Sequence, residues 1–283
     1  MSRLADRFAE LKSARRTALI PYLTAGDPAP DATADFMHAL VEAGADVIEL
    51  GVPFTDPMAD GPVIQAACER ALAHNTSLRD VLDMVERFRE RDTDTPVVLM
   101  GYFNPIDSMG LEIFGKRARA AGVDGALIVD MTAEEAPDIA PALAEAGIDP
   151  VCLIAPTTGE ARIARICENA AGFIYYVSFK GVTGASSLDT GGLAAQIAPI
   201  RRATRLPVGV GFGVRTPENA AAVAAVADAV VVGSALVRQI AEHGADRSAA
   251  ARKLSETLAA MRAAIDRYDE SKRDPNEQEG ESA

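Results

Sequence analysis

The chain has 283 residues, 48% of them hydrophobic, and a formal net charge of −13. This length and composition suffice for one large core, and they favour one α/β barrel over two small domains. The acidic balance disfavours a surface for nucleic acid or anionic membrane. Tryptophan is absent and aromatic residues make up only 5%, so the core depends on aliphatic side chains, as in parallel strands that are buried on both faces.

Cysteine and histidine usage narrows the class of protein further. Cys68, Cys152 and Cys167 have no C-x-x-C spacing, which indicates reduced, buried thiols in a cytoplasmic protein. The three histidines are scattered, and we expect no metal site. No apolar run approaches the roughly 20 residues of a membrane span, and the first residues lack the apolar segment of a signal peptide.

Strand and helix patterns alternate along the whole chain. Leu4, Phe8 and Leu11 recur at helical spacing, which predicts an extra N-terminal helix that covers the bottom of a barrel. Eight strand–helix repeats then imply parallel neighbours and a closed (β/α)8 TIM barrel. Short apolar runs predict strands at 18–23, 47–50, 96–100, 125–129, 150–154, 173–177, 207–210 and 229–232. Helical patterns include 31–43, 77–91, 111–121, 160–169 and 193–202, and an extra helix at 63–73 after the second strand.

The last barrel helix carries Leu254, Leu258, Met261 and Ile265 on one face. From Asp269 onward the sequence turns polar and acidic. We therefore expect one barrel domain over residues 1–268, and a disordered acidic tail over 269–283 without an assigned function.

Glu49 is the most informative residue of the chain. It lies near the carboxyl end of an otherwise apolar predicted strand, where alternation places Val47 and Glu49 on one face and Ile48 on the other. TIM barrels keep their chemistry at this end of the strands. A desolvated carboxyl has a raised pKa and suits general acid–base catalysis near neutral pH. The alternative is a structural carboxylate that is paired with a neighbouring strand or loop.

Asp60 and Asp56 follow in the loop after that strand. Asp60 stands before Gly61 and Pro62, so by pattern alone it is best interpreted as the N-cap of the next helix. Turn formation explains Asp56 well enough.

Tyrosines and glycines mark the second half of the barrel. One of Tyr175 and Tyr176 must point into the barrel, because neighbours in a strand alternate. Glycines follow three strands, at 181–184, 211–213 and 233, the last before Ser234. Loops of this kind in TIM barrels commonly hold a phosphate on bare amides and a helix N-terminus. Tight turns are the simpler alternative. Residues 181–187 are interpreted either as a lid that closes over substrate or as an ordinary loop.

At these residues the chain resembles the alpha-subunit family of tryptophan synthases. The resemblance runs from about Leu4 to the last barrel helix. Its most specific stretch spans 44–65, around Glu49 and Asp60, with support from 22–28, 181–184 and 211–214. The Asp130-Met131-Thr132 run departs from the family pattern at the edge that contacts the beta subunit, which concerns the strength of coupling and not the chemistry.

The resemblance implies a lyase that cleaves indole-3-glycerol phosphate by a retro-aldol reaction into indole and glyceraldehyde 3-phosphate. Glu49 would protonate indole C3, and Asp60 would hold the indole N–H. No cofactor is implied in this chain, since pyridoxal phosphate belongs to the beta subunit of an α2β2 heterotetramer. The substrate-binding residues that the resemblance implies are Tyr22, Tyr175, Thr183, Gly184, Phe212, Gly213, Gly233 and Ser234.

Two other functions stay open at this point. One is a stand-alone lyase that releases free indole, and the other is a catalytically idle barrel that binds a phosphate ligand. Intact Glu49 and Asp60 argue against the idle barrel. A phosphate-binding barrel of isomerase type would not be expected to match the stretch from Glu49 to Asp60.

Overall fold

A computed structural model describes residues 2–177, 190–211 and 213–272. Eight parallel strands close into a barrel in chain order, with β1 paired to β8 as well as to β2. Each predicted strand agrees with an observed one to within a single residue at either end, so the TIM-barrel prediction is confirmed. The strands are β1 (Ala18–Thr24), β2 (Ile48–Gly51), β3 (Val97–Gly101), β4 (Gly125–Ile128), β5 (Asp149–Ile154), β6 (Ile174–Val177), β7 (Val208–Gly211) and β8 (Ala229–Val232).

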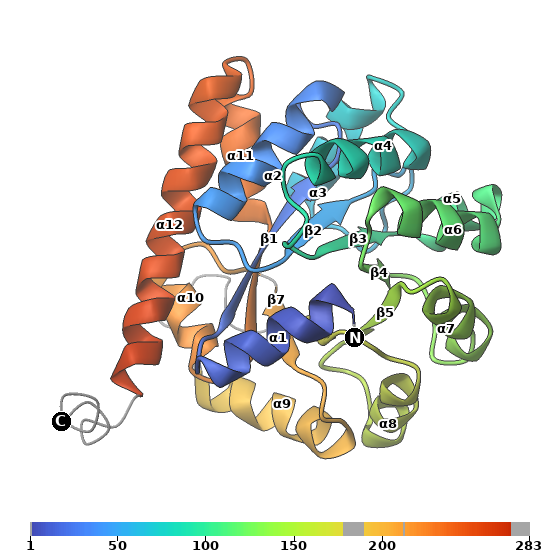
Figure 1. Ribbon diagram of the computed structural model, residues 1–283. Helices are drawn as coiled ribbons and strands as arrows, with labels where there is room; N and C mark the ends of the chain where they lie inside the picture. Colours follow the sequence, from blue (N-terminus) through green and yellow to red (C-terminus); the bar gives the residue numbers. More distant parts are fainter. Residues whose placement is uncertain (1, 178–189, 212, 273–283) are drawn as a thin grey trace.

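Helices surround this barrel (Figure 1). Two of them were not expected from the sequence: α5, which is short and contains Pro105, and α11, which begins directly after the Gly233 turn. The barrel helices are α2 (Thr33–Glu42), α4 (Leu78–Arg89), α6 (Leu111–Ala121), α7 (Ala136–Glu145), α8 (Glu160–Glu168), α9 (Thr190–Ala203), α10 (Pro217–Ala224) and α12 (Arg247–Ser271). The additional helices are α1 (Arg3–Ser13), α3 (Pro62–Leu72), α5 (Phe103–Met109), α11 (Ser234–His243) and the 3-10 turn η1 (Pro30–Ala32). No helix in the described part of the chain is long and apolar enough to cross a membrane.

Strand alternation divides the core into two shells. Val47 belongs to the cluster inside the barrel, whereas Ile48 and Leu50 belong to the cluster between strands and helices. The predicted facing of the second strand is therefore confirmed. Helix α1 closes the inner cluster from below, because Leu4, Phe8 and Leu11 are buried in it.

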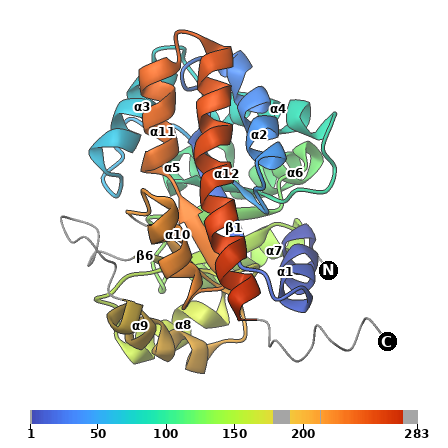
Figure 2. The ribbon, with the colours of Figure 1, turned by 90° about the vertical axis from the view of Figure 1, so that its left-hand side faces the viewer.

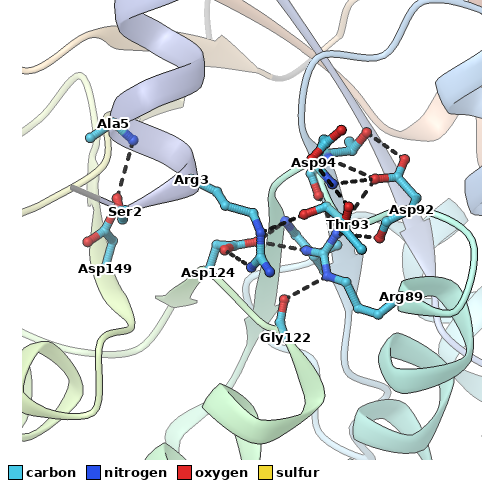
Figure 3. A network of polar contacts seen from close by, with 12 residues as sticks. Ser2, Arg3, Ala5, Arg89, Asp92, Thr93, Asp94, Gly122, Asp124 and Asp149 are labelled. Carbon is cyan, nitrogen blue, oxygen red and sulfur yellow. Dashed lines mark hydrogen bonds and ion pairs between the residues drawn. The ribbon is translucent and has the colours of Figure 1, made fainter.

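The N-terminal end of the barrel is held by paired charges. Asp124 is 1% exposed at its side chain, and it accepts ion-pair contacts from Arg3 at 2.7 Å and Arg89 at 2.8 Å. It also accepts the backbone N–H of Val97 at 2.9 Å. Figure 3 shows the two guanidinium groups converging on this carboxylate, Arg3 from α1 and Arg89 from the end of α4. Helix α1 is thereby tied to the beginnings of β3 and β4.

A second charged network joins α12 to the first two strands. Arg262 donates to the Thr17 carbonyl at 2.9 Å and to Asp46 at 3.2 Å, and Asp46 also accepts the Leu19 N–H at 2.9 Å. Helix α12 thus packs along the barrel beside α2, α10 and α11 (Figure 2).

The predicted boundary of the acidic tail was wrong by a few residues. Helix α12 continues to Ser271. Asp269 is only 3% exposed, and its carboxylate accepts the Thr17 N–H at 2.7 Å and the Thr17 hydroxyl at 2.9 Å. A contact 252 residues away in the chain thus orders a residue that looks like the start of a solvated segment. Residues 273–283 lie outside the described part of the chain.

Candidate active site

A cavity of about 270 Å³ opens at the carboxyl ends of the strands. Its wall is mostly aliphatic, and polar groups enter from β1, β2, the loop after β2, β6 and the segments after β7 and β8. Among the described residues, all seven of the predicted catalytic and substrate-binding positions line this one cavity: Tyr22, Glu49, Asp60, Tyr175, Gly213, Gly233 and Ser234. Thr183, Gly184, Phe212 and the predicted lid at 181–187 lie outside the described residues.

Glu49 is a buried carboxyl group with few polar contacts to replace the water that it loses on burial. It is 1% exposed, and its Oε1 has no hydrogen-bond partner among the residues that the structure describes. Burial, with a smaller contribution from the Asp60 carboxylate, raises the pKa of Glu49 to about 8. At neutral pH this side chain is a protonated acid that holds a proton ready for transfer.

Asp60 is held in place by Tyr102. The Tyr102 hydroxyl donates to Asp60 Oδ2 at 3.0 Å and accepts the Ala59 N–H at 2.9 Å, and the Tyr102 ring stacks on Phe54 with centroids 5.1 Å apart. Burial raises the pKa of Asp60, while the hydrogen bond from Tyr102 acts in the opposite direction. Tyr102 therefore favours the ionised form of Asp60 and fixes where it points.

The interpretation of Asp60 as an N-cap was wrong. Gly61 is the N-cap residue of α3, and no side chain caps that helix. The Asp60 backbone carbonyl instead accepts from the Gln65 amide at 2.8 Å. The Asp60 side chain is thus free of a capping role and lines the cavity.

Two tyrosines reach the cavity because glycines stand beside them. A Cβ atom on Gly51 would overlap the Tyr22 hydroxyl, and one on Gly211 would overlap the Tyr175 hydroxyl. Burial raises the pKa of both tyrosines well above the usual value. Tyr175 is therefore the inward residue of β6, while Tyr176 points outward and donates to Gln196 at 2.8 Å. Gly211, which the sequence suggested as part of a phosphate loop, has a packing role.

The wall of the cavity that the segments after β7 and β8 form is suited to an anion. Gly233 is the N-cap of α11 and Ser234 its first residue, so backbone N–H groups at this helix end lie at the cavity. Gly213 has a φ of 82°, which favours glycine. Arg215 and Arg238 also line the cavity, and the sequence analysis missed both. Arg238 is four residues after Ser234, and this spacing on one helix face was the available signal.

Two further acids that follow β1 and β4 make contacts outside the cavity. Asp27 forms an ion pair with Arg70 at 2.7 Å. Asp130 accepts the Phe103 N–H at 2.8 Å at the start of α5. Within the described ranges, no group of His, Cys, Asp or Glu side chains could hold a metal ion.

The fold and the cavity define a TIM-barrel enzyme that uses carboxyl groups for proton transfer beside an anion-binding wall. The sequence profile described as tryptophan synthase alpha chain matches residues 8–266. The chain belongs to the tryptophan synthase alpha chain family. It is accordingly a lyase of tryptophan biosynthesis, and its reaction is the retro-aldol cleavage of indole-3-glycerol phosphate to indole and glyceraldehyde 3-phosphate.

Individual relatives agree with this assignment. The tryptophan synthase alpha chain of Thioalkalivibrio sulfidiphilus is 61% identical over 266 residues, which cover 94% of this chain and 100% of that protein. The alpha chain of Burkholderia thailandensis is 58% identical over 94% of this chain and 97% of its own length. A crystal structure of the subunit alpha from Legionella pneumophila superposes with a TM-score of 0.88 at 45% identity, covering 94% of this chain and 99% of that one.

Proposed function

We propose that Glu49 and Asp60 carry the cleavage of indole-3-glycerol phosphate in this cavity. The observation that supports the proposal most directly is the pairing of two unlike carboxyl groups. Glu49 is buried with one oxygen unpartnered and has a pKa of about 8. Asp60 is held by a hydroxyl donor, which favours its ionised form. One is an acid and the other a charge partner.

The chemistry assigns each carboxyl group a step. Protonated Glu49 donates to indole C3, which places positive charge on the ring nitrogen. The Asp60 carboxylate accepts the ring N–H and stabilises this cation. Breaking the bond between C3 and the side chain returns the electron pair to the ring. Glu49, now a carboxylate, takes the proton of the side-chain hydroxyl as that carbon becomes the aldehyde, and the acid form is regenerated.

The remaining substrate contacts follow from the shape of the cavity. The aliphatic wall, which includes Leu127 and Leu153, suits the flat indole ring. Tyr22 and Tyr175 line the ring site. Gly213, Gly233 and Ser234 bind the phosphate through backbone N–H groups and the start of α11, with Arg215 and Arg238 adding positive charge. For Thr183, Gly184 and Phe212 we retain the substrate-binding roles that the family resemblance implies.

The alpha-chain family name implies a beta-subunit partner, and we propose an α2β2 heterotetramer. Pyridoxal phosphate is assigned to the beta subunit and no cofactor to this chain. A cytoplasmic setting fits the three cysteines, which are unpaired thiols.

Indole release from indole-3-glycerol phosphate tests the proposal. The purified chain is assayed alone and with a beta subunit added. Weak activity alone that rises sharply with the partner supports the alpha-subunit role. Full activity alone would replace the heterotetramer with a stand-alone lyase. Absence of activity in both conditions would remove the roles given to Glu49 and Asp60.

A further inference from the structure

A second cavity lies at the other end of the barrel. Its volume is about 560 Å³, and it lies open to solvent between α1, the connection from α9 to β7, and the end of α12. These three segments lie in the lower part of Figures 1 and 2. Although the chain has a net charge of −13, this basic cavity is lined by six cationic side chains: Lys12, Arg15, Arg16, Arg201, Arg205 and Lys272.

The carboxylates of the basic cavity are already occupied. In the described part of the chain, the acids of its lining are Asp228 and Asp269. Asp269 accepts two hydrogen bonds from Thr17. Asp228 accepts the Val208 N–H at 2.9 Å and pairs with Arg201 at 3.2 Å. Arg16 pairs with Asp266, outside the lining, at 3.5 Å. Among the described residues, the lining still holds more cationic side chains than acids.

Two of the cations have no ion-pair or hydrogen-bond partner in the part of the chain that the structure describes, namely Lys12 and Arg205. The Lys272 ammonium group contacts the Ala224 carbonyl, at 3.4 Å, and the face of the Tyr268 ring, at 4.3 Å. Helix C-termini attract cations, and this effect accounts for Lys12 at the end of α1 and for Lys272 at the end of α12. It does not account for Arg205, which lies beyond the end of α9.

We propose that the basic cavity is a binding site for an acidic peptide segment, and that its occupant is the chain's own residues 273–283. This segment carries four acids, Asp274, Glu277, Glu279 and Glu281, and one cation, Arg273. It begins at the residue after Lys272, which itself lines the cavity. At most about 3.5 Å per residue separates successive positions, so every acid of the segment can reach the cavity.

The covalent link makes weak affinity sufficient. A short tether gives a local concentration of about 1 mM. A segment whose free peptide binds with a Kd of about 0.1 mM would then occupy the cavity about nine-tenths of the time. The family profile ends at residue 266, so its match does not include residues 273–283.

A peptide-binding experiment tests the proposal on the full chain. The four acids of 273–283 are neutralised together (Asp274→Asn, Glu277→Gln, Glu279→Gln, Glu281→Gln), which leaves the cavity vacant. A synthetic peptide with the native sequence of 273–283 is then titrated by calorimetry at low salt. We expect a Kd of about 0.1 mM, weakening as salt screens the charges, and at least ~10-fold weaker binding to the unmodified chain, whose own segment competes.

Substitutions in the basic cavity locate the site. In the neutralised chain, Arg205→Glu and Lys12→Glu should each weaken peptide binding about tenfold, on the scale of a charge-assisted contact. Both side chains are exposed, so the fold should tolerate the changes. Lys116→Glu, an exposed change on α6, is the matched control and should leave the affinity unaltered.

Three results would overturn the proposal. The first is a peptide Kd above about 10 mM, since the tether would then leave the cavity mostly vacant. The second is equal peptide affinity for the neutralised and unmodified chains. The third is a comparison with pyrophosphate as probe. Equal, Arg205-dependent binding of pyrophosphate to both chains would make the cavity a site for small anions that the segment does not fill.

Discussion

Buried carboxyl groups lie at both ends of this barrel, and they differ in whether other groups are paired with them. At the N-terminal end, Asp124 contacts two guanidinium groups and a backbone N–H. At the C-terminal mouth, Glu49 is equally buried, and its Oε1 has no partner among the described residues. A buried carboxylate with ion-pair partners holds secondary-structure elements together, and removing one partner of such a pair is strongly destabilising. A buried carboxyl group without such partners has a raised pKa, keeps its proton near neutral pH, and can act as a general acid.

Substitution of Glu49 should have the largest effect. Glu49→Gln removes the transferable proton but keeps the shape, so we expect kcat for indole release to fall about 10²- to 10⁴-fold, the usual contribution of general acid–base catalysis. The thermal midpoint should remain that of a folded barrel. Glu134→Gln, which removes a surface charge paired with Arg162, serves as the control with normal turnover. Near-normal turnover in Glu49→Gln would remove the assigned role.

Substitution of Asp124 should show the opposite pattern. Asp124→Asn leaves Arg3 and Arg89 without their anion, so we expect a loss of about 3–5 kcal/mol in the free energy of unfolding, measured by urea denaturation. Turnover per folded molecule should stay unchanged, because Asp124 is at the far end of the barrel. The exposed pair of Glu134 and Arg162 should contribute less than about 1 kcal/mol in the same assay. Equal losses of unfolding free energy in Asp124→Asn and Glu134→Gln would contradict the structural role given to Asp124.

Tyr102→Phe should have a smaller effect on catalysis. It removes the hydroxyl that donates to Asp60 but preserves the stacking on Phe54. Loss of a hydrogen bond to a charged group corresponds to about 1.5–3 kcal/mol, so we expect kcat/KM to fall about 10- to 100-fold. Because Tyr102 acts through Asp60, the double variant with Asp60→Asn should lose little more than Asp60→Asn alone. Fully additive losses would show that Tyr102 acts independently.

The last prediction concerns the pH dependence of stability. The pKa of Glu49 is raised from 4.5 to about 8 in the folded chain. Between these two pH values the unfolded chain releases the Glu49 proton while the folded chain keeps it. The contribution of Glu49 to the free energy of unfolding is therefore fully present below about pH 4.5 and is lost as the pH rises toward 8. The Glu49→Gln variant has no carboxyl group at this position, so its stability does not fall in this way as the pH rises. The urea midpoint of the variant should therefore rise relative to the unmodified chain from pH 5 to pH 8, and a constant difference would contradict the raised pKa.

Local patterns predicted the barrel well and the site only in part. Apolar runs and alternation placed all eight strands and put Glu49 inside. Alternation left Tyr175 and Tyr176 as equal candidates for the inward position, and only the resemblance selected Tyr175. Asp60 shows why pattern is not enough, since the residues around it match a helix cap and only the resemblance suggested chemistry. Its partner Tyr102 directly follows another strand, β3, and is 42 positions away in the chain, so no local signal connects the two.

Long-range contacts also explain the error at the end of the barrel. Asp269 begins a polar stretch, and its composition predicts solvent exposure. In the fold it meets Thr17, whose N–H and hydroxyl satisfy both carboxylate oxygens. Arg215 and Arg238 were missed for a different reason, because the glycine pattern predicts an anion held by bare amides and does not itself indicate the cations that follow the glycines.

The seam between β1 and β8 has a consequence for how the chain is made. Residues 18–21 pair with residues 229–232, so one edge of the first strand has no neighbour until the last strand has been synthesised. At about 5–20 residues per second, this interval lasts roughly 10–40 s. An unpaired strand edge is a template for association with other chains. The nascent chain is therefore most vulnerable to aggregation before β8 emerges, and the ring that gives the finished enzyme no free edges leaves a temporary one during translation.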